Sequence, residues 1–480
     1  MYYPSLEDVT KLAEQGNLIP VYREVSADLE TPVSAYLKIA QAPYAFLLES
    51  VEGGERLARY SFIGTEPFDV IRTGLDQPQG EGDPLLLIED KLAKYTPVSV
   101  EGLPRFVGGA VGFLSYDTVR YFENIPSPVE DTLGTPEALF LLVDTMLVFD
   151  HARHKIKVVS HVHISGEDIE GAYGQAIERI ERLVAKLDQP LNMELYRRNN
   201  DNACKRSQEI SFNISKNEYH SIVDRIKDYI YAGDVIQTVL SQRLSVKTDA
   251  APFDIYRSLR TVNPSPYMYF LEFEDFCIAG TSPELLVQVE EGVVSNHPIA
   301  GTRPRGSNED EDSALEVELR EDEKERAEHI MLVDLARNDI GRVSVPGTVE
   351  VTQLMDVERY SHVMHLVSHV QGILRPELTV YDTLRASFPA GTVSGAPKIR
   401  AMQIISELEP DRRGPYAGAV GYFGFSGNMD TAITIRTIVI KNGIAYIQAG
   451  GGIVADSTSE GEYQETLHKA QALLRALAEA

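Results

Sequence analysis

Residues 416–454 read YAGAVGYFGFSGNMDTAITIRTIVIKNGIAYIQAGGGIV, and this stretch decides how we interpret the fold. It contains three runs rich in Val, Ile, Ala and Tyr: YAGAVGYFGF, DTAITIRTIVI and IAYIQAGGGIV. Polar and Gly-containing breaks separate them. Short apolar runs bounded by turn residues are typical of β-strands. We therefore predict three strands here.

Working outward, further short runs predict more strands, and longer periodic segments predict helices. Strands are expected at 44–48, 106–114, 139–149 and 235–246, and helices at 167–187, 210–232, 313–340, on both sides of a Gly-Pro loop within 380–408, and at 459–477. Two of the helices have apparent capping boxes, Ser313 with Glu316 and Ser459 with Glu462. Because strands dominate and the helices pack outside them, the expected fold class is α+β rather than a doubly wound parallel sheet.

A polar, aperiodic segment divides the chain. Residues 188–209 read DQPLNMELYRRNNDNACKRSQE. Such composition is typical of a connecting segment. We expect an N-terminal domain at 1–187, a linker at 188–209 and a second domain at 210–480.

Composition excludes several classes of protein. The 480 residues carry a formal net charge of −27, which repels nucleic-acid phosphates. No apolar run is long enough to span a membrane, and the first residues lack the pattern of a signal peptide, so we expect a cytoplasmic protein. Only two cysteines occur, Cys204 and Cys277, too few for a disulfide framework or a cysteine metal site. The chain contains no Trp.

Two Glu-x-x-Glu pairs are the strongest chemical signal: Glu325 with Glu328, and Glu462 with Glu465. Residues three apart share one face of a helix, so each pair projects two carboxylates in one direction. Four carboxylates from two helices would form an oxygen-rich site suited to Mg²⁺. For a single pair, a solvated helix face is the more common explanation. Glu462 could also serve only the helix cap.

Longer motifs carry a resemblance to a known family. KERAEHIMLVDLARNDIGRV (324–343), FPAGTVSGAPK (388–398), GPYAGAVGY (414–422), TAITIRT (431–437) and QAGGGIVADSTSEGEYQETLHKA (448–470) follow one another in this order. With them the chain resembles the chorismate-utilising enzymes, and within that family the anthranilate synthase large subunits. The resemblance is strongest over 215–475. It implies large, mainly antiparallel sheet layers with helices outside, and a second domain that binds chorismate.

The resemblance assigns the acidic pairs and a set of substrate contacts. It implies that Glu328 and Glu465 ligate Mg²⁺, supported by Glu325 and Glu462, and that the metal holds the ring carboxylate of chorismate. Arg436 and Tyr416 resemble the clamp on the enolpyruvyl carboxylate, and an Arg in an apolar run is suited to an anion. Further expected substrate contacts are Gly301, Thr302, Gly450, Gly451 and Gly452, the middle glycine replacing the alanine of most relatives.

Four residues resemble the catalytic machinery. Glu284 resembles the general acid that protonates the departing ring hydroxyl, which requires a pKa raised by burial. His365 resembles the histidine of the pyruvate-releasing step. Thr392 is expected at the substrate, although an ordinary turn would also explain it. Lys469, one turn beyond Glu465, is expected to balance the carboxylates.

Two positions separate members of the family. Isochorismate- and salicylate-forming relatives have a lysine where this chain has Gln237, and aminodeoxychorismate synthases have a lysine where it has Ala300. Both differences favour anthranilate formation from chorismate and ammonia. The remaining alternatives are an aminodeoxychorismate synthase subunit and, from a different class, a non-catalytic tryptophan sensor.

The resemblance also implies regulation and a partner. LLES contributes Glu49 and Ser50, and NPSPYM contributes Pro266, Tyr267 and Met268, to an expected site for the inhibitor L-tryptophan shared between the two domains. A strand end and a Pro-rich turn are the simpler explanation of either motif alone. Neither Cys204 nor Cys277 resembles a glutaminase nucleophile, so ammonia is expected from a separate glutamine amidotransferase subunit.

Overall fold

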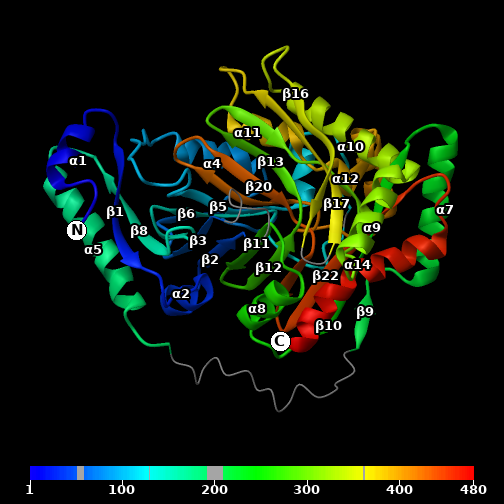
Figure 1. The fold of residues 1–480 in the computed structure, drawn as a ribbon, viewed down its shortest axis with the longest axis horizontal. Helices are drawn as coiled ribbons and strands as arrows, with labels where there is room; N and C mark the ends of the chain where they lie inside the picture. The colour runs from blue at the N-terminus through cyan, green and yellow to red at the C-terminus, as the bar shows by residue number, and fades with distance from the viewer. Residues whose placement is uncertain (51–58, 129, 192–208, 361–362) are drawn as a thin grey trace.

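The computed structural model describes residues 1–480 except 51–58, 129, 192–208 and 361–362. Its described part contains two large β-sheets, which we call sheet A and sheet B, and their ladder pairs are antiparallel. The α+β class and the mainly antiparallel layers are therefore confirmed. Figure 1 shows α1 (Leu6–Leu12) and α5 (Ile169–Leu187) at one end of the molecule and α7 (Lys216–Ala232) at the other.

Sheet A contains 12 strands within the described residues. In spatial order they are β1 (Leu18–Ser26), β8 (Lys155–His163), β7 (Thr145–Asp150), β3 (Tyr60–Thr65), β2 (Ala45–Glu49), β11 (Tyr267–Glu272), β12 (Phe276–Ser282), β21 (Thr437–Lys441), β22 (Ile444–Ile453), β10 (Gln237–Lys247) and β18 (Gly395–Ala396), with β9 (Ile210–Phe212) beside β10.

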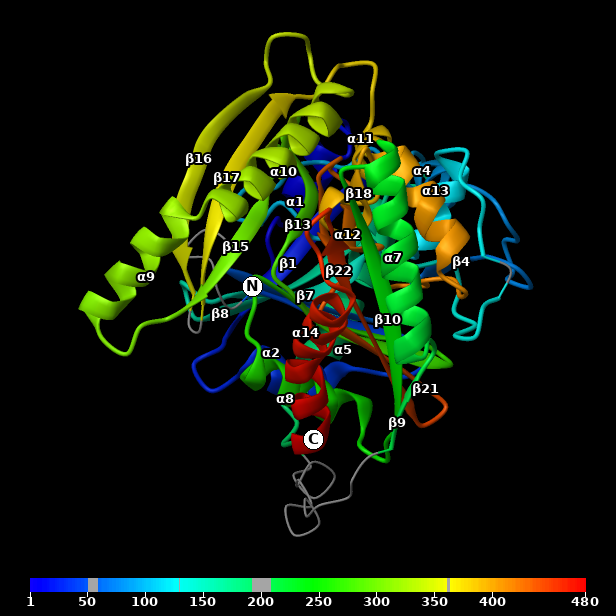
Figure 2. The same cartoon turned by 90° about the vertical axis from the view of Figure 1, so that its right-hand side faces the viewer.

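Sheet B contains ten strands in the same part of the chain. Their order is β15 (Ile299–Pro304), β17 (Val363–Ile373), β14 (Val293–Asn296), β13 (Leu285–Glu290), β20 (Met429–Ile433), β19 (Ala419–Gly424), β5 (Gly109–Leu114), β6 (Ala138–Val143) and β4 (Asp69–Thr73), with β16 (Glu350–Arg359) beside β17. In Figure 2, β15, β16 and β17 project from the rest of the molecule together with α9 (Glu309–Glu321).

Three of the five apolar cores in the described part of the chain separate four layers. One core lies between the sheets and contains Phe46, Phe113, Ile278 and Val420. A second covers the outer face of sheet A, under α1, α2 (Pro32–Ile39), α5, α8 (Pro252–Val262) and α14 (Ser459–Glu479). A third covers the outer face of sheet B, under α4 (Pro84–Leu92), α10 (Glu323–Gly341), α11 (Val380–Ser387), α12 (Gly391–Ser394) and α13 (Lys398–Leu408). Each sheet thus has one face toward its partner sheet and the other under helices.

Both sheets combine strands from before and after the expected linker. In sheet A, β2 pairs with β11, and in sheet B, β5 pairs with β19. Most of the expected linker, 192–208, lies outside the described residues. The division into 1–187 and 210–480 stays a prediction about the chain, because the sheets themselves do not separate along it.

Several predicted boundaries are wrong, each because a local cap or sheet pairing decides the geometry. Residues 210–212 form β9 instead of starting a helix, and Ser215 caps α7. The helix predicted at 313–340 is two helices, because the Asp322 carboxylate accepts from the backbone N–H groups of Lys324 and Glu325 and starts α10. The expected capping boxes at Ser313 and Ser459 are absent: Asn308 caps α9, and Thr458 caps α14.

The second apolar run of the opening stretch is also two strands, which lie in different sheets. Residues 429–433 form β20 of sheet B and 437–441 form β21 of sheet A. Arg436 lies between them with φ of 51°, a left-handed conformation that turns the chain. The chain therefore crosses from one sheet to the other inside a run that looks continuous in the sequence.

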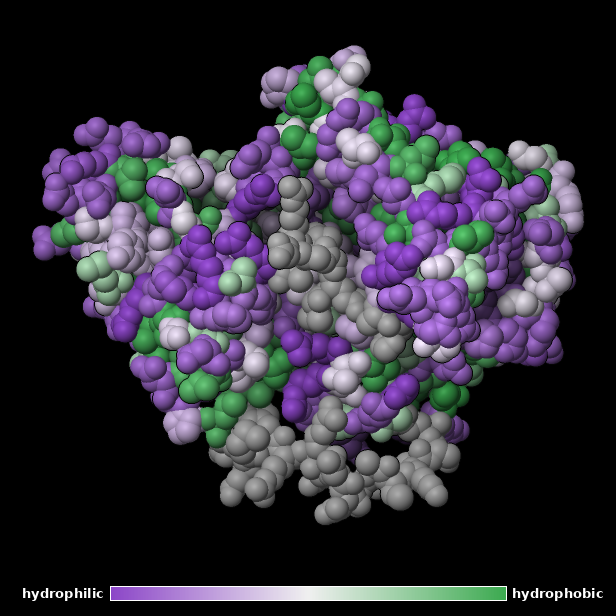
Figure 3. All heavy atoms as spheres, viewed as in Figure 1, coloured by the Kyte–Doolittle hydropathy of each residue, from purple (hydrophilic) through white to green (hydrophobic). Residues whose placement is uncertain are grey.

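Most of the face shown in Figure 3 is hydrophilic, with hydrophobic side chains in small scattered groups.

Gly112 permits the close packing of sheet B. A β-carbon there would lie 1.9 Å from the Leu139 carbonyl oxygen of the neighbouring strand. We expect Gly112→Ala to destabilise the protein by about 1–3 kcal/mol, because the strands must separate to admit the methyl group. The midpoint of thermal unfolding measures this. Gly82→Ala is the control, since no atom lies within 4 Å of its β-carbon position; equal midpoints would contradict the packing argument.

Candidate functional site

Two sheet crossings lie side by side and carry the central polar residues. Glu284 lies where β12 of sheet A leads into β13 of sheet B, and Arg436 lies where β20 leads back into β21. The Ile433 N–H donates to the Glu284 carbonyl at 3.0 Å, and the Thr281 N–H donates to the Arg436 carbonyl at 3.1 Å. The backbone thereby fixes both side chains at the rim of one cavity of about 300 Å³.

Glu284 is buried in the wall of this cavity. Burial raises the pKa of its carboxyl to about 8, while Thr392 and the Lys469 ammonium act in the lowering direction. The Thr392 hydroxyl lies close to the carboxyl, although no hydrogen bond of normal geometry satisfies it. A carboxyl with this pKa holds its proton at neutral pH and can donate it to a leaving group.

His365, on β17, is oriented by the neighbouring strand β15. Its Nδ1 lies 3.0 Å from the Gly301 carbonyl oxygen and 3.0 Å from the Thr302 hydroxyl. Because a carbonyl can only accept, Nδ1 carries the proton and Nε2 keeps its lone pair. Burial lowers the pKa of the ring, so His365 is neutral near pH 7 and Nε2 can act as a base.

Arg436 supplies positive charge without a paired carboxylate. Its Nη1 donates to the Lys469 carbonyl at 2.5 Å, and no ion pair involves it within the described residues. Burial lowers the pKa of the guanidinium, while Tyr416 and Glu465 act to raise it. A buried guanidinium without a counter-ion is suited to an anionic ligand.

The glycine triplet lets three side chains approach the backbone. A β-carbon on Gly450 would lie 2.7 Å from the Tyr416 hydroxyl, and one on Gly452 would lie 2.4 Å from Gln237 Nε2. On Gly451 it would lie 2.8 Å from Glu462 Oε2. An alanine at 451, which the chain lacks, would therefore press on a flexible carboxylate rather than on the loop backbone.

The two acidic pairs approach the cavity from α10 and α14. Glu328, Glu462 and Glu465 line it. Gln237 Nε2 donates to Glu328 at 3.4 Å, Ser457 donates to Glu462 at 2.6 Å, and Lys469 pairs with Glu465 at 2.7 Å. Burial, and then the neighbouring carboxylate of Glu328, raise the pKa of Glu325. Glu462 also has a raised pKa, chiefly from burial, with Glu465 adding to it.

These carboxylates fit Mg²⁺ in donor chemistry, although they are not drawn together. Within the described residues, no three acidic, His or Cys side chains form a ready metal cluster. Glu462 Oε2 is buried without a hydrogen-bond partner, and the charges within each pair repel. Oxygen donors whose negative charges repel one another are suited to a hard cation.

Most of the predicted catalytic and substrate residues line this single cavity; Gly301, Gly451 and Glu325 lie directly behind its wall. Lys324 and Gln448 also line it, and no role was predicted for them. Lys324 lowers the pKa of Glu462 on the other helix, across the cavity. The sequence signal that could have identified Lys324 is its position next to Glu325 in the KERAEH motif.

A second cavity, of about 110 Å³, lies between the sheets and is lined by all five residues predicted for regulation: Glu49, Ser50, Pro266, Tyr267 and Met268. Aromatic side chains also line it, namely Tyr60, Phe62, Tyr269 and Tyr422. An aromatic wall of this kind is suited to a flat apolar ligand.

The charged groups of this cavity differ from the prediction. The Glu49 carboxylate accepts from Tyr256 at 2.5 Å and from two nitrogens of Arg260 at 3.2 Å, so α8 already holds it. Asp430, which the sequence did not single out, lines the cavity as well. Its Oδ2 accepts from Gln288 at 2.9 Å, its Oδ1 makes no hydrogen bond of normal geometry, and burial raises its pKa to about 7. Asp430 is thus the better partner for an amino group.

Comparison with known proteins identifies the family. Residues 43–475 match the model of the chorismate binding enzymes. The chain is 50% identical over 495 residues to anthranilate synthase component 1 of Acetivibrio thermocellus, covering 100% of this chain and 99% of that protein. It is 50% identical over 488 residues to the component 1 of Pseudomonas aeruginosa, covering 98% of each.

Solved structures agree with this fold. The crystal structure of anthranilate synthase component I from Streptococcus pneumoniae TIGR4 has a TM-score of 0.77 and 40% identity, covering 94% of this chain and 98% of that one. The menaquinone-specific isochorismate synthase of Escherichia coli, at 19% identity and a TM-score of 0.70, shares the fold over 98% of each chain.

The raised pKa of Glu284 can be measured without an activity assay. We expect an infrared band of a protonated carboxyl at pH 7 that disappears as the pH rises through about 8, since the group is protonated below its pKa. The band should be missing in Glu284→Gln. The pKa of the Asp430 carboxyl is raised to about 7, so this group gives a second band. The loss of that band in Asp430→Asn identifies it. If Glu284→Gln leaves the pH 7 spectrum unchanged, Glu284 is ionised and the general-acid assignment is wrong.

Proposed function

The chain belongs to the chorismate-binding enzyme family, and from this premise we propose that it is the large subunit of an anthranilate synthase. It converts chorismate and ammonia to anthranilate, pyruvate and water. The observation that carries the proposal is one cavity that combines the proton donor Glu284, the neutral base His365 and the unpaired cation Arg436 with the uncharged Gln237 and Ala300.

Substrate binding rests on charge. Chorismate is a dianion, and the chain has a formal charge of −27, so local cations must capture it. Arg436, with Tyr416 and the backbone of Gly450 and Gly452, faces the enolpyruvyl carboxylate. Mg²⁺ would be held by Glu328 and Glu465, supported by Glu325 and Glu462. Bound there, it would offset their charge and hold the ring carboxylate.

The first step adds nitrogen to the ring. Ammonia bonds to the second ring carbon, the ring double bonds shift, and the hydroxyl leaves as water with the proton of Glu284. Gln237 cannot serve as a base that activates water, since a neutral amide is far too weakly basic to take a proton from water, so ammonia rather than hydroxide is the nucleophile. The added ammonium group loses one proton and the Glu284 carboxylate regains one, so the charges balance and Glu284 returns to its protonated state.

The second step makes the ring aromatic. His365 Nε2 takes the proton from the carbon that now bears nitrogen, and the carbon–oxygen bond to the enolpyruvyl group breaks. The released enolate takes a proton on its methylene carbon and becomes pyruvate, and the loss of one proton from His365 returns the ring to its neutral state. The neutral state that burial gives His365 is the state this step requires.

Ammonia comes from a glutamine amidotransferase partner. Cys277 is buried and burial raises the pKa of its thiol to about 12, which opposes a thiolate nucleophile; Cys204 lies outside the described residues.

No helix in the described residues could cross a membrane. The expected cytoplasmic location stays a prediction.

L-tryptophan is the inhibitor suited to the second cavity. Its indole matches the aromatic wall, and its ammonium group would pair with Asp430. Glu49 connects this cavity to α8 through Arg260, and α8 packs in one apolar core with α14, which carries Glu462 and Glu465. A ligand that shifts β2 would therefore bias the position of the acidic pair.

The activity is tested by anthranilate fluorescence with chorismate, ammonium and Mg²⁺. Glu328→Gln and Glu465→Gln should each lower kcat/KM by about a hundredfold or more and weaken Mg²⁺ binding in calorimetry, because each removes a hard ligand. Glu460→Gln is the control, since Glu460 lies on α14 but pairs at the surface with Lys216. Accumulation of an aminated intermediate that keeps its pyruvyl group would indicate an aminodeoxychorismate synthase, and tryptophan binding without turnover would indicate a sensor.

Feedback is tested at Asp430. Asp430→Asn should raise the tryptophan concentration for half-inhibition about tenfold or more, since a hydrogen-bonded charge pair to the ammonium is lost, with kcat/KM for chorismate unchanged. Asp275→Asn, which removes a surface carboxylate paired with Arg72, is the control. Unaltered inhibition in Asp430→Asn and in Ser50→Ala/Met268→Thr would place the inhibitor elsewhere.

A further inference from the structure

A fully buried ion pair stands behind the catalytic cavity. Arg413 and Glu409, on the segment after α13, have side chains that are 1% and 4% exposed. Arg413 Nε donates to Glu409 at 2.8 Å and its Nη2 donates to the same carboxylate at 2.7 Å. Replacing such pairs by apolar side chains is often neutral for stability. The role of the Arg413–Glu409 pair beyond stability therefore depends on its other contacts.

The remaining hydrogen bonds go to residues that line the catalytic cavity or that lie beside them on β10. Arg413 Nη1 donates to the Val393 carbonyl at 2.7 Å, next to Thr392, and Nη2 donates to the Val239 carbonyl at 2.8 Å. Glu409 accepts from the N–H and hydroxyl of Ser241 at 2.8 and 2.9 Å. Val239 and Ser241 are the strand partners of Gly452 and Gly450. The pair thus fixes the strand against which the glycine triplet lies.

The guanidinium also stacks on the clamp itself. Its Cζ lies 5.6 Å from the centre of the Tyr416 ring and 4.6 Å from that of Tyr116. A cation over the ring favours the tyrosine orientation and strengthens its hydroxyl as a donor. The pKa of Tyr416 is raised to about 12, chiefly by burial, and Arg413 acts in the lowering direction.

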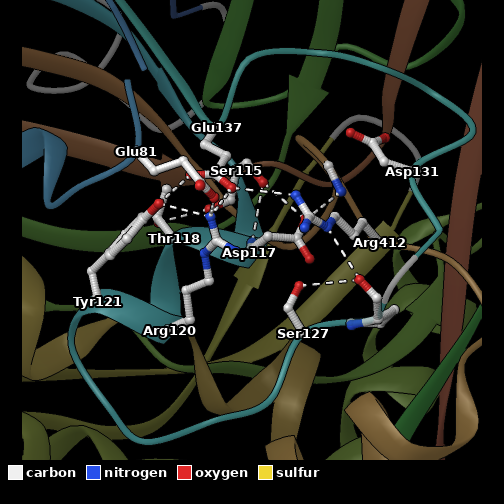
Figure 4. Close-up of polar contacts among 12 residues, drawn as sticks. Glu81, Ser115, Asp117, Thr118, Arg120, Tyr121, Ser127, Asp131, Glu137 and Arg412 are labelled. Atoms are coloured by element: carbon white, nitrogen blue, oxygen red, sulfur yellow. Dashed lines mark hydrogen bonds and ion pairs between the residues drawn. The ribbon is translucent and has the colours of Figure 1, made fainter. Parts of the chain in front are cut away.

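The backbone beside Arg413 is anchored from the opposite side. The Asp117 carboxylate accepts from the Gly414 N–H at 2.8 Å, and the Arg412 guanidinium reaches Glu137 and the Pro128 carbonyl. Figure 4 shows this second network around Asp117, Arg120, Glu137 and Arg412. Because the segment is held on both sides, the Arg413 fork has a fixed origin.

We propose that Arg413, held by Glu409, is a positioning residue that sets Tyr416, the Gly450–Gly452 backbone and Thr392 for the enolpyruvyl carboxylate of the substrate. This rests on the proposed function. The shape of the guanidinium carries the role: a lysine keeps the charge opposite Glu409 but cannot reach both carbonyls and stack on Tyr416 at once.

A double-mutant cycle tests the proposal. Arg413→Lys should raise KM for chorismate about tenfold or more while KM for ammonium stays within about twofold, because only the clamp is displaced. Tyr416→Phe should lower kcat/KM for chorismate about tenfold in the parent protein but about twofold or less in Arg413→Lys. Full multiplication of the two effects would show that Arg413 does not act through Tyr416, and would overturn the proposal.

Arg179→Lys is the matched control. Arg179, on α5, lies near Asp144, and its guanidinium donates to the Ser160 hydroxyl at 2.8 Å and the His161 carbonyl at 2.6 Å, outside the catalytic cavity. Its effect should multiply with that of Tyr416→Phe. If Arg413→Lys does not fold, Glu409→Met/Arg413→Met replaces it in the cycle.

Calorimetry separates failure of this inference from failure of the proposed function. If the parent protein forms no anthranilate, the proposed function is wrong. The same cycle is then read on chorismate affinity, where non-additivity still supports the positioning role and additivity overturns it. If the parent protein is active and the cycle is additive, only the positioning role is wrong.

Discussion

The site depends on one backbone constraint, the pair of hydrogen bonds that joins two neighbouring sheet crossings. The bonds from Ile433 to Glu284 and from Thr281 to Arg436 hold two polar side chains where a sheet strand would normally bury apolar ones. Neither residue could sit within a continuous strand with its side chain in the core, because its charge or proton would be unpaired. The crossing supplies a rigid position outside both apolar faces.

This position also explains how opposite electrostatic requirements are met in one cavity. Glu284 must stay protonated, Arg436 must stay charged, and the carboxylates of α10 and α14 must stay ionised to hold a cation. Glu284 is the most deeply buried of these and has the largest described shift. The lysines Lys324 and Lys469 lie among the acidic residues instead. The ionisation state of each group is therefore set by its own surroundings, which differ over a few ångströms, and not by one average environment.

Long apolar and helical patterns were predictable from the sequence, and local transitions were not. The strand at 416–425 and the helix ending at 187 were found, because periodicity extends over many residues. The crossing at Arg436 was missed, since a φ of 51° at one residue leaves no periodic signal and Val, Ile and Thr continue on both sides. Asp322 was missed for a similar reason: in an acidic helix, a capping carboxylate looks like any other.

The candidate site was predictable to a similar extent: residues within motifs were identified, and residues defined by long-range contacts were not. Motif resemblance indicated Glu284, His365 and Arg436, whereas Asp430 and Arg413 depend on contacts between residues far apart in the chain. Asp430 is distinguished by a buried oxygen without a partner, and Arg413 by the carbonyls that its fork reaches. No spacing rule encodes either property.

The two cavities are parts of one mechanical element. Asp430 and Ala432 of β20 line the second cavity, and the same strand leads directly into Ile435 and Arg436 of the catalytic cavity. Because β20 is hydrogen-bonded to β13, which starts at Leu285 directly after Glu284, a displacement of β20 along its length cannot leave the crossings in place. Interfaces of this kind move between discrete arrangements rather than bending continuously, since their cores are close-packed. A ligand bound in the second cavity and the geometry of Glu284 and Arg436 are therefore linked through β20. One end of this strand belongs to the second cavity and the other leads into the catalytic cavity.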